Sequence, residues 1–225
     1  MMPVCSRVLL IIASLWLNTV IAENWEPRTP SGQTVALWVD PQSPDRPYDM
    51  VRGEITLQVP IFPLLAMLQD ADRQRDWLPY SQDVRVLKHP APSQTLVQFR
   101  TVTRWPFRPR DAITRFDVTT LPPAQLRIDM VNQPEAVPKQ PGYLRIEQAE
   151  GYWLLTALAD CKTHVRYESG SRWGGMIPQW LVNKSNRDLA REALLNLKQW
   201  SETHYRNYRS NDENHSSITV HQHCR

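Results

Sequence analysis

Residues 173–200 read WGGMIPQWLVNKSNRDLAREALLNLKQW, and this stretch determines how the rest of the chain has to be arranged. It contains one apolar stripe at helical spacing. The stripe consists of Leu189, Ala190, Ala193, Leu194, Leu197 and Trp200. Pro178 suits the start of a helix, because the amide that proline lacks would have no partner in the first turn. The pattern predicts a helix over 178–205, roughly 40 Å long at about 1.5 Å per residue.

The segments before this helix alternate between apolar and polar side chains, as half-buried strands do. In 48–59, for example, Ile55, Leu57 and Val59 share one face. Further strands are predicted at 34–39, 84–88, 95–104, 112–119, 125–131, 143–149, 152–158 and 164–168. The segment 61–76 changes to helical spacing, with Phe62 and Leu65 among its inward positions.

This order of elements predicts an α+β domain. Strands that follow one another closely between 83 and 168 are expected to pair as an antiparallel meander. A curved antiparallel sheet would then wrap around the long C-terminal helix. The space between a bent sheet and such a helix need not be filled, so we expect an internal apolar cavity there.

Residues 1–22 are typical of a cleaved secretory signal. Arg7 precedes an apolar run at 8–17 that is too short to span a bilayer comfortably, and Val20 and Ala22 are the small residues that precede a cut. We therefore predict cleavage after Ala22 and a periplasmic or secreted protein; an uncleaved membrane anchor is the alternative. The remainder divides into one folded domain at 23–208 and a polar, flexible tail at 209–225.

Composition and motifs exclude several classes of function. The formal net charge of +3 is too small to favour nucleic acid as a partner. The sequence contains no Gly-x-Ser-x-Gly, no His-Glu-x-x-His and no glycine-rich phosphate loop, so it predicts neither a catalytic site nor a cofactor. The tail residues His215, His221, His223 and Cys224 lack regular ligand spacing, and no metal site is predicted.

The sequence leaves two questions of covalent and quaternary structure open. An oxidising compartment would permit a disulfide between Cys161 and Cys224. The pattern of residues does not decide this pairing, and it does not indicate an oligomeric state.

Three motifs resemble those of StAR-related lipid-transfer (START) domains. Residues 104–111, RWPFRPRD, resemble the Trp-Pro…Arg-Asp signature of these domains, and 76–79, DWLP, resemble the segment after their short helix. Residues 174–183, GGMIPQWLVN, resemble the entry to their last helix. The order and spacing of the motifs agree over roughly 49–202.

The resemblance implies a helix-grip fold with a cavity for one lipid or sterol-like molecule, roofed by the C-terminal helix. Most such domains bind or transfer lipid without chemistry, and transient membrane contact would accompany transfer. Aromatase/cyclase enzymes that act on hydrophobic substrates use the same fold and are the alternative. The ligand itself, the donor and acceptor membranes and any protein partner are not indicated.

The candidate ligand-binding residues include a lid group and a pair on one strand. Met176, Ile177 and Trp180 follow a Gly-Gly joint and would form a lid together with the last helix. Trp153 and Leu155 lie on a strand that is apolar on both faces, where cavity lining and plain core fit equally well. The full set is Arg100, Trp105, Trp153, Leu155, Met176, Ile177, Trp180, Asn183, Ala193 and Leu197.

Each polar candidate could have a structural role, and Arg100 and Asn183 could instead bind a ligand. Arg100 shares a strand face with Gln98 and would ordinarily meet solvent, but it could point inward to a ligand hydroxyl or carboxylate. Asn183, together with Ser185 and Asn186, forms either a solvated first turn or a polar notch facing the cavity. Arg110 and Asp111 are predicted to form a structural ion pair that fixes the turn into the next strand.

Overall fold

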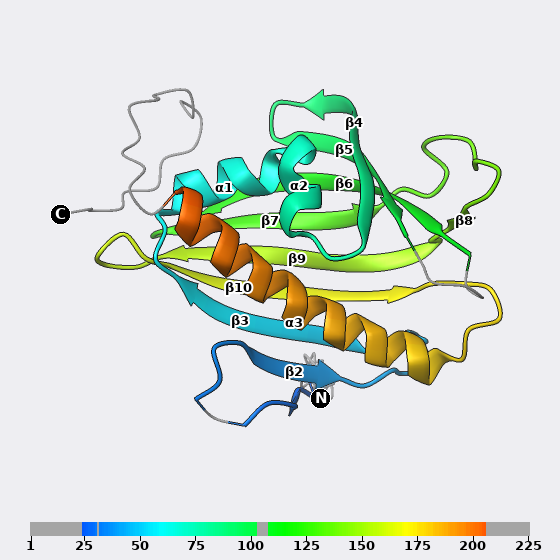
Figure 1. The fold of residues 1–225 in the computed structure, drawn as a ribbon, viewed down its shortest axis with the longest axis horizontal. Helices are drawn as coiled ribbons and strands as arrows, with labels where there is room; N and C mark the ends of the chain where they lie inside the picture. The colour runs from blue at the N-terminus through cyan, green and yellow to red at the C-terminus, as the bar shows by residue number, and fades with distance from the viewer. Residues whose placement is uncertain (1–23, 31, 103–107, 206–225) are drawn as a thin grey trace, which may run out of the picture.

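The structure is a computed structural model and describes residues 24–30, 32–102 and 108–205. The strands are β1 Glu26–Pro27, β2 Ala36–Asp40, β3 Met50–Leu57, β4 Ser81–Ala91, β5 Gln94–Thr101, β6 Arg110–Leu121, β7 Gln125–Asn132, β8 Leu144–Arg145, β9 Gln148–Ala157 and β10 Thr163–Arg172. The helices are α1 Ile61–Gln69, α2 Ala71–Trp77 and α3 Gln179–His204. Figure 1 shows α3 lying across a single broad sheet.

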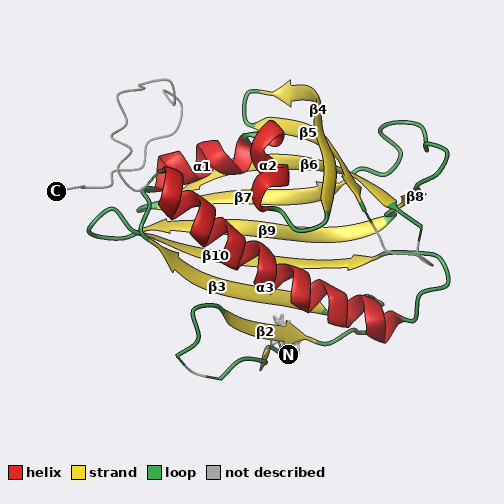
Figure 2. Cartoon of the chain, in the orientation of Figure 1, coloured by secondary structure: helices red, strands yellow, loops and turns green. Residues whose placement is uncertain are grey.

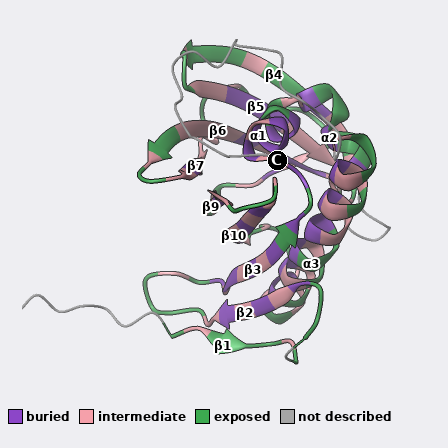
Figure 3. Cartoon of the chain, turned by 90° about the vertical axis from the view of Figure 1, so that its left-hand side faces the viewer, coloured by how far each residue is buried: buried purple, intermediate pink, exposed green. Residues whose placement is uncertain are grey.

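The sheet has ten strands, nine of them in the order β1-β2-β3-β10-β9-β7-β6-β5-β4. All neighbours on this path pair antiparallel, so the strands from β4 to β10 form the predicted meander. The short strand β8 pairs with β6 in parallel. Figure 3 shows the strands following an arc, with the helices along its open side. The expected helix-grip architecture is therefore confirmed.

The predicted strands 143–149 and 152–158 have the wrong boundaries, because the chain forms the short strand β8 and then one strand, β9, from Gln148 to Ala157. A break was expected between 149 and 152, but β9 runs through Gly151 without interruption. A Cβ at Gly151 would lie 2.3 Å from the carbonyl oxygen of Glu168 and 2.5 Å from the methyl carbon of Met130. This glycine permits a close approach inside the sheet and does not mark a turn.

The short helix predicted over 61–76 is divided into two helices. Asp70 ends α1 and is also the N-cap of α2, where its side chain accepts a hydrogen bond from the amide of Arg73 at 3.3 Å. Aspartate competes for backbone amides in this way and so favours a helix start over a helix interior. Leu65 is buried as predicted, whereas Phe62 is only half-buried.

The long helix is confirmed, with Pro178 as the residue that precedes its first turn. Figure 2 shows α3 against the strands, with α1 and α2 beside it. It packs directly on β3 at Gly53, where an added Cβ would lie 2.4 Å from the Cδ1 atom of Leu194. Gly53 therefore sets how closely the helix can approach the sheet.

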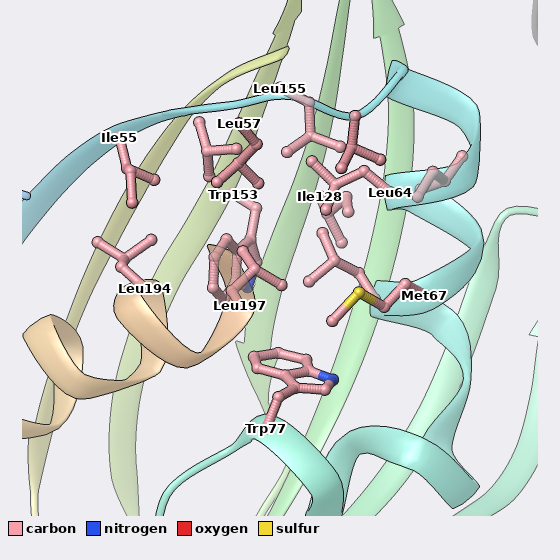
Figure 4. Close-up of a cluster of buried hydrophobic side chains, with 14 of the residues drawn as sticks. Ile55, Leu57, Leu64, Met67, Trp77, Ile128, Trp153, Leu155, Leu194 and Leu197 are labelled. Carbon is pink, nitrogen blue, oxygen red and sulfur yellow. The ribbon is translucent and has the colours of Figure 1, made fainter. Parts of the chain in front are cut away.

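The hydrophobic core occupies only part of the space between the sheet and the helices. It joins α1 and the second half of α3 to strands β3, β7 and β9 (Figure 4). Its fully buried members include Leu57, Leu64, Leu155, Leu194 and Leu197. The first half of α3 lies beyond this cluster, over a part of the sheet where the space is not filled.

Several sequence predictions concern residues outside the described ranges. They are the signal at 1–22 with its cut after Ala22, the tail at 209–225 and the segment 104–107, and they stay predictions. Cys161 is disulfide-bonded, and its partner is not among the described residues. Within the described ranges, no helix has both the length and the apolar character that crossing a membrane requires.

Candidate functional site

A pocket of about 500 Å³ lies between the concave face of the sheet, α2 and the first half of α3. This volume falls within the range of small-molecule sites. The sheet contributes lining residues from strands β5, β6, β7, β9 and β10, and α3 contributes Ser185, Asn186, Leu189 and Ala193. The pocket therefore occupies the space between sheet and helix.

One end of the pocket is apolar. The apolar lining side chains from the sheet include Val97, Phe99, Phe116, Ile128, Met130 and Trp153, and Thr95, Thr114 and Asn132 lie among them. The Trp153 ring lies 4.2 Å from the ring of Tyr167 and 6.3 Å from the nearly perpendicular ring of Trp77, measured between centroids. Figure 4 shows Trp77 and Trp153 beside the core leucines. These rings separate the pocket from the filled core.

The other end of the pocket is polar. Asn186 on α3 accepts hydrogen bonds from the indole Nε1 of Trp173 at 3.0 Å and from the hydroxyl of Ser171 at 3.3 Å. Its amide nitrogen donates to the carbonyl oxygen of Ser171 at 3.2 Å. This network fixes the Trp173 ring against the helix. The alternative that a polar notch on α3 faces the pocket therefore holds for Ser185 and Asn186.

Arg110 lies at this polar end and is only 2% exposed. Its guanidinium carbon lies 5.4 Å from the centroid of the Trp173 ring. One of its terminal nitrogens donates to the carbonyl oxygen of Arg108 at 2.6 Å, and its Nε is buried and has no hydrogen-bond partner among the described residues. Burial lowers the pKa of Arg110, because the charged form loses its hydration.

The predicted ion pair between Arg110 and Asp111 is wrong. Consecutive strand residues point to opposite faces of a sheet, so these two side chains cannot meet. Asp111 points to the convex face and pairs with Arg145, whose Nη2 lies 2.8 Å and whose Nε lies 3.0 Å from the carboxylate oxygens. Both side chains are 1% exposed. Gln98 also donates to this carboxylate, at 3.2 Å.

The proline-rich connector between β7 and β8, residues 133–143, covers this ion pair. Arg145 donates to the carbonyl oxygens of Val137 at 3.1 Å and Pro138 at 3.3 Å, and also to that of Pro134. A buried carboxylate, one guanidinium and several connector carbonyls therefore form one network. It holds the connector on the back of the sheet, away from the pocket.

Arg100 lies on the same convex face and does not line the pocket. Val97, Phe99 and Thr101 of β5 point inward, so Arg100 points outward. Its guanidinium pairs with Asp83 at 3.3 Å, bonds to Gln140 of the connector and lies 5.3 Å from the Tyr143 ring centroid. The idea that Arg100 meets a ligand is thus wrong. Among the described arginines, Arg110 is the one that lines the pocket.

The remaining candidate residues are divided between the pocket, the core and the surface. Trp153 and Ala193 line the pocket, whereas Leu155 and Leu197 are fully buried in the core cluster. Asn183 is buried but turns away, accepting hydrogen bonds from the amide of Asp49 at 3.3 Å and from Gln179 at 2.8 Å. Trp105 lies outside the described residues.

The proposed lid residues point outward. Trp180 is 68% exposed and Met176 is fully exposed, while Ile177 is half-buried; none of them lines the pocket. Gly174 and Gly175 both have positive φ, 67° and 73°, as a tight joint before α3 requires. Among the described residues, Trp173 is the aromatic side chain of this segment that reaches the pocket.

Metal binding has no support in the described part of the chain. No group of three or more histidine, cysteine or acidic side chains there is arranged to hold an ion. The tail histidines fall outside the described ranges.

Sequence comparisons find a distant relative but no family. No protein-family model matches the sequence. An uncharacterized protein of Pseudomonas aeruginosa is 21% identical over 155 residues, which is 69% of this chain and 76% of that protein.

Solved structures resemble the fold more clearly. A StAR-related lipid transfer protein from Xanthomonas axonopodis has a TM-score of 0.71 at 24% identity, covering 78% of this chain and 97% of that one. Human StAR-related lipid transfer protein 5 has a TM-score of 0.69 at 16% identity, covering 81% and 88%. The ZhuI aromatase/cyclase of a Streptomyces species has a TM-score of 0.51 at 13% identity, covering 68% and 93%. The chain therefore has the helix-grip fold of START domains.

Proposed function

We propose that this protein is a START-type carrier that binds one lipid or sterol-like molecule in the pocket beneath α3. The observation that carries the proposal is a pocket lined mostly by apolar side chains, in which Arg110, Trp173 and Asn186 gather as one polar group. An amphipathic ligand fits such a space, because its tail would be buried among aromatic rings while its head group keeps polar partners. Each buried methylene would contribute about 0.8 kcal/mol. The lipid transfer proteins among the structural neighbours support the same class of ligand.

The proposed location is the periplasm or the exterior, following cleavage after Ala22. The signal-like N-terminus supports this location. In such a compartment the donor and acceptor of a lipid would be membrane surfaces.

Analysis of the protein purified from its own host tests binding directly. Native mass spectrometry should show a mass above that of the polypeptide, and solvent extraction should release one class of hydrophobic molecule. Substituting a polar residue for an apolar lining residue, such as Phe116→Asn, should reduce this occupancy. Purified protein that carries no extractable molecule and takes up none from vesicles would contradict a carrier function.

Exposed apolar side chains at the start of α3 predict the route of transfer. Met176 projects from the segment before α3 and Trp180 from the first turn of the helix, where they could enter a lipid surface. Trp180→Ala should slow transfer of a fluorescent lipid between vesicles several-fold, without lowering the melting temperature. Val86→Ala, at another exposed apolar position, is the matched control. Equal transfer rates for both variants and the wild type would argue against membrane contact through this segment.

An aromatase/cyclase activity is the second candidate, because one structural neighbour has that activity. Among the described lining residues there is no histidine. The carboxylates of Asp188 and Glu192 lie on the exposed side of α3, and that of Glu150 accepts a hydrogen bond from Tyr48 at 3.0 Å. This lining favours binding over acid–base chemistry. An extracted ligand that is returned chemically unchanged after incubation would support the carrier.

A further inference from the structure

The polar end of the pocket contains a charge that no residue of the described ranges balances. Arg110 is 2% exposed, and among the described residues no carboxylate forms an ion pair with it. The contrast with the other buried guanidinium is sharp: Arg145 makes two hydrogen bonds to the Asp111 carboxylate and others to backbone carbonyls. An isolated buried cation is costly, so such a group ordinarily has a partner.

The carboxylates that line the pocket are used elsewhere or face solvent. Asp188 pairs with Lys184 at 2.5 Å and is 64% exposed, and Glu150 accepts a hydrogen bond from the hydroxyl of Tyr48 at 3.0 Å. Glu192 lies on the exposed side of α3. None of them neutralises the guanidinium.

The surroundings of Arg110 hold the guanidinium in place but leave donors free. The Trp173 ring lies 5.4 Å from its guanidinium carbon, and Trp173 is itself fixed by Asn186. A guanidinium has five N–H donors. In the described structure one bond goes to the carbonyl of Arg108, and Nε has no partner. An arginine that is oriented in this way matches the planar, two-oxygen geometry of a carboxylate or a phosphate.

We propose that Arg110 is the head-group site of the pocket and that the ligand is an anionic amphiphile, held through a carboxylate or phosphate oxyanion. This inference rests on the proposed carrier function and specifies its ligand class. The apolar rings from Phe99 to Trp153 would hold the alkyl or ring portion, and the oxyanion would complete the hydrogen bonds of Arg110. A neutral alcohol of the same length would fill the apolar end and leave the cation unpaired.

The test compares ligands that differ only in their head group. Palmitate, hexadecyl phosphate and hexadecanol compete with the neutral dye Nile red for binding to the exported protein, from which copurifying lipid has been removed. The wild type should bind at least one of the two anions about tenfold or more tighter than the alcohol, because hydrogen bonds to a charged group are the strong ones. The order of the two anions identifies the source of the oxyanion.

Variants separate this site from general binding. Arg110→Gln should abolish the preference for the anion while hexadecanol binding stays within about twofold, and Arg110→Lys should restore part of the preference. Arg100→Gln removes a half-buried guanidinium on the opposite face of the sheet and should leave the preference unchanged. Thermal melts of each variant confirm that it is folded.

The outcomes distinguish failure of the oxyanion site from failure of the carrier function. If all three ligands bind the wild type with similar affinity, or if Arg110→Gln keeps the preference, the oxyanion site is refuted and the carrier function stands. If none of the three displaces the dye from the wild type, the proposed carrier function fails and the oxyanion site fails with it.

Discussion

Replacement of Arg145 by methionine should lower the free energy of unfolding by about 3–5 kcal/mol, the typical cost of removing one partner from a buried ion pair. The Asp111 carboxylate is 1% exposed and would keep only the hydrogen bond from Gln98. The carbonyls of Val137 and Pro138 would lose their donor in the same step. Urea denaturation of both proteins measures the difference.

Two controls identify the buried charge as the cause. Arg127→Met breaks the pair with Asp129, whose side chains are 35% and 36% exposed, and should cost less than about 1 kcal/mol. Adding Asp111→Leu to Arg145→Met removes the stranded carboxylate and should recover much of the loss, because an apolar pair can replace a buried ion pair. An Arg145→Met protein as stable as the wild type would show that the ion pair does not hold the connector.

The fold could be predicted from the sequence because its signals are local. The apolar stripe from Leu189 to Leu197 and the alternation in 48–59 are readable without tertiary structure. The break at Asp70 and the continuity of β9 through Gly151 were missed for opposite reasons. Asp70 acts as a cap between an apolar and a charged helix, and Gly151 permits a close approach inside a strand.

The polar end was harder to predict, because its residues come from β6, from α3 and from the end of β10, and because β6 is covered on both faces. Ile113 is fully buried on the convex side of β6, whereas Thr114 and Phe116 line the pocket. Apolar residues on both faces give no indication of which way Arg110 or Asp111 points. Only the position of the connector, which brings Arg145 over Asp111, decides it. That contact joins positions 34 residues apart and has no local signature.

The lid was assigned by the size of its side chains, which does not reveal their direction. Met176 and Trp180 are large and apolar, and they were expected to face a ligand. The structure points them to solvent and uses Trp173, on the other side of the Gly-Gly joint, to close the polar end. The positive φ of both glycines turns the chain between these residues. Asn186 lies on the helix face that contains Ala190 and Ala193, and this spacing is visible in the sequence. It places Asn186, the hydrogen-bond partner of Trp173, toward the pocket.

Ala193→Trp should weaken ligand binding more than tenfold while changing the stability of the ligand-free protein little. Ala193 is 4% exposed and lines the pocket from α3, so a larger side chain at this position would occupy space that the ligand needs. Displacing two methylenes of ligand would cost about 1.6 kcal/mol at about 0.8 kcal/mol each. That exceeds the 1.4 kcal/mol that correspond to a factor of about ten in affinity.

The stability of the same variant reports whether the space is empty. In a filled core, inserting a larger side chain typically costs about 1–3 kcal/mol, because neighbours are forced out of their rotamers. Beside a pocket of about 500 Å³ the indole has room and buries its own apolar surface. Gln199→Trp, at an exposed position of the same helix, controls for the effect of tryptophan on α3 itself. Dye displacement and thermal melts of both variants give the two quantities, and an Ala193→Trp protein that binds as tightly as the wild type would show that ligands do not occupy this part of the pocket.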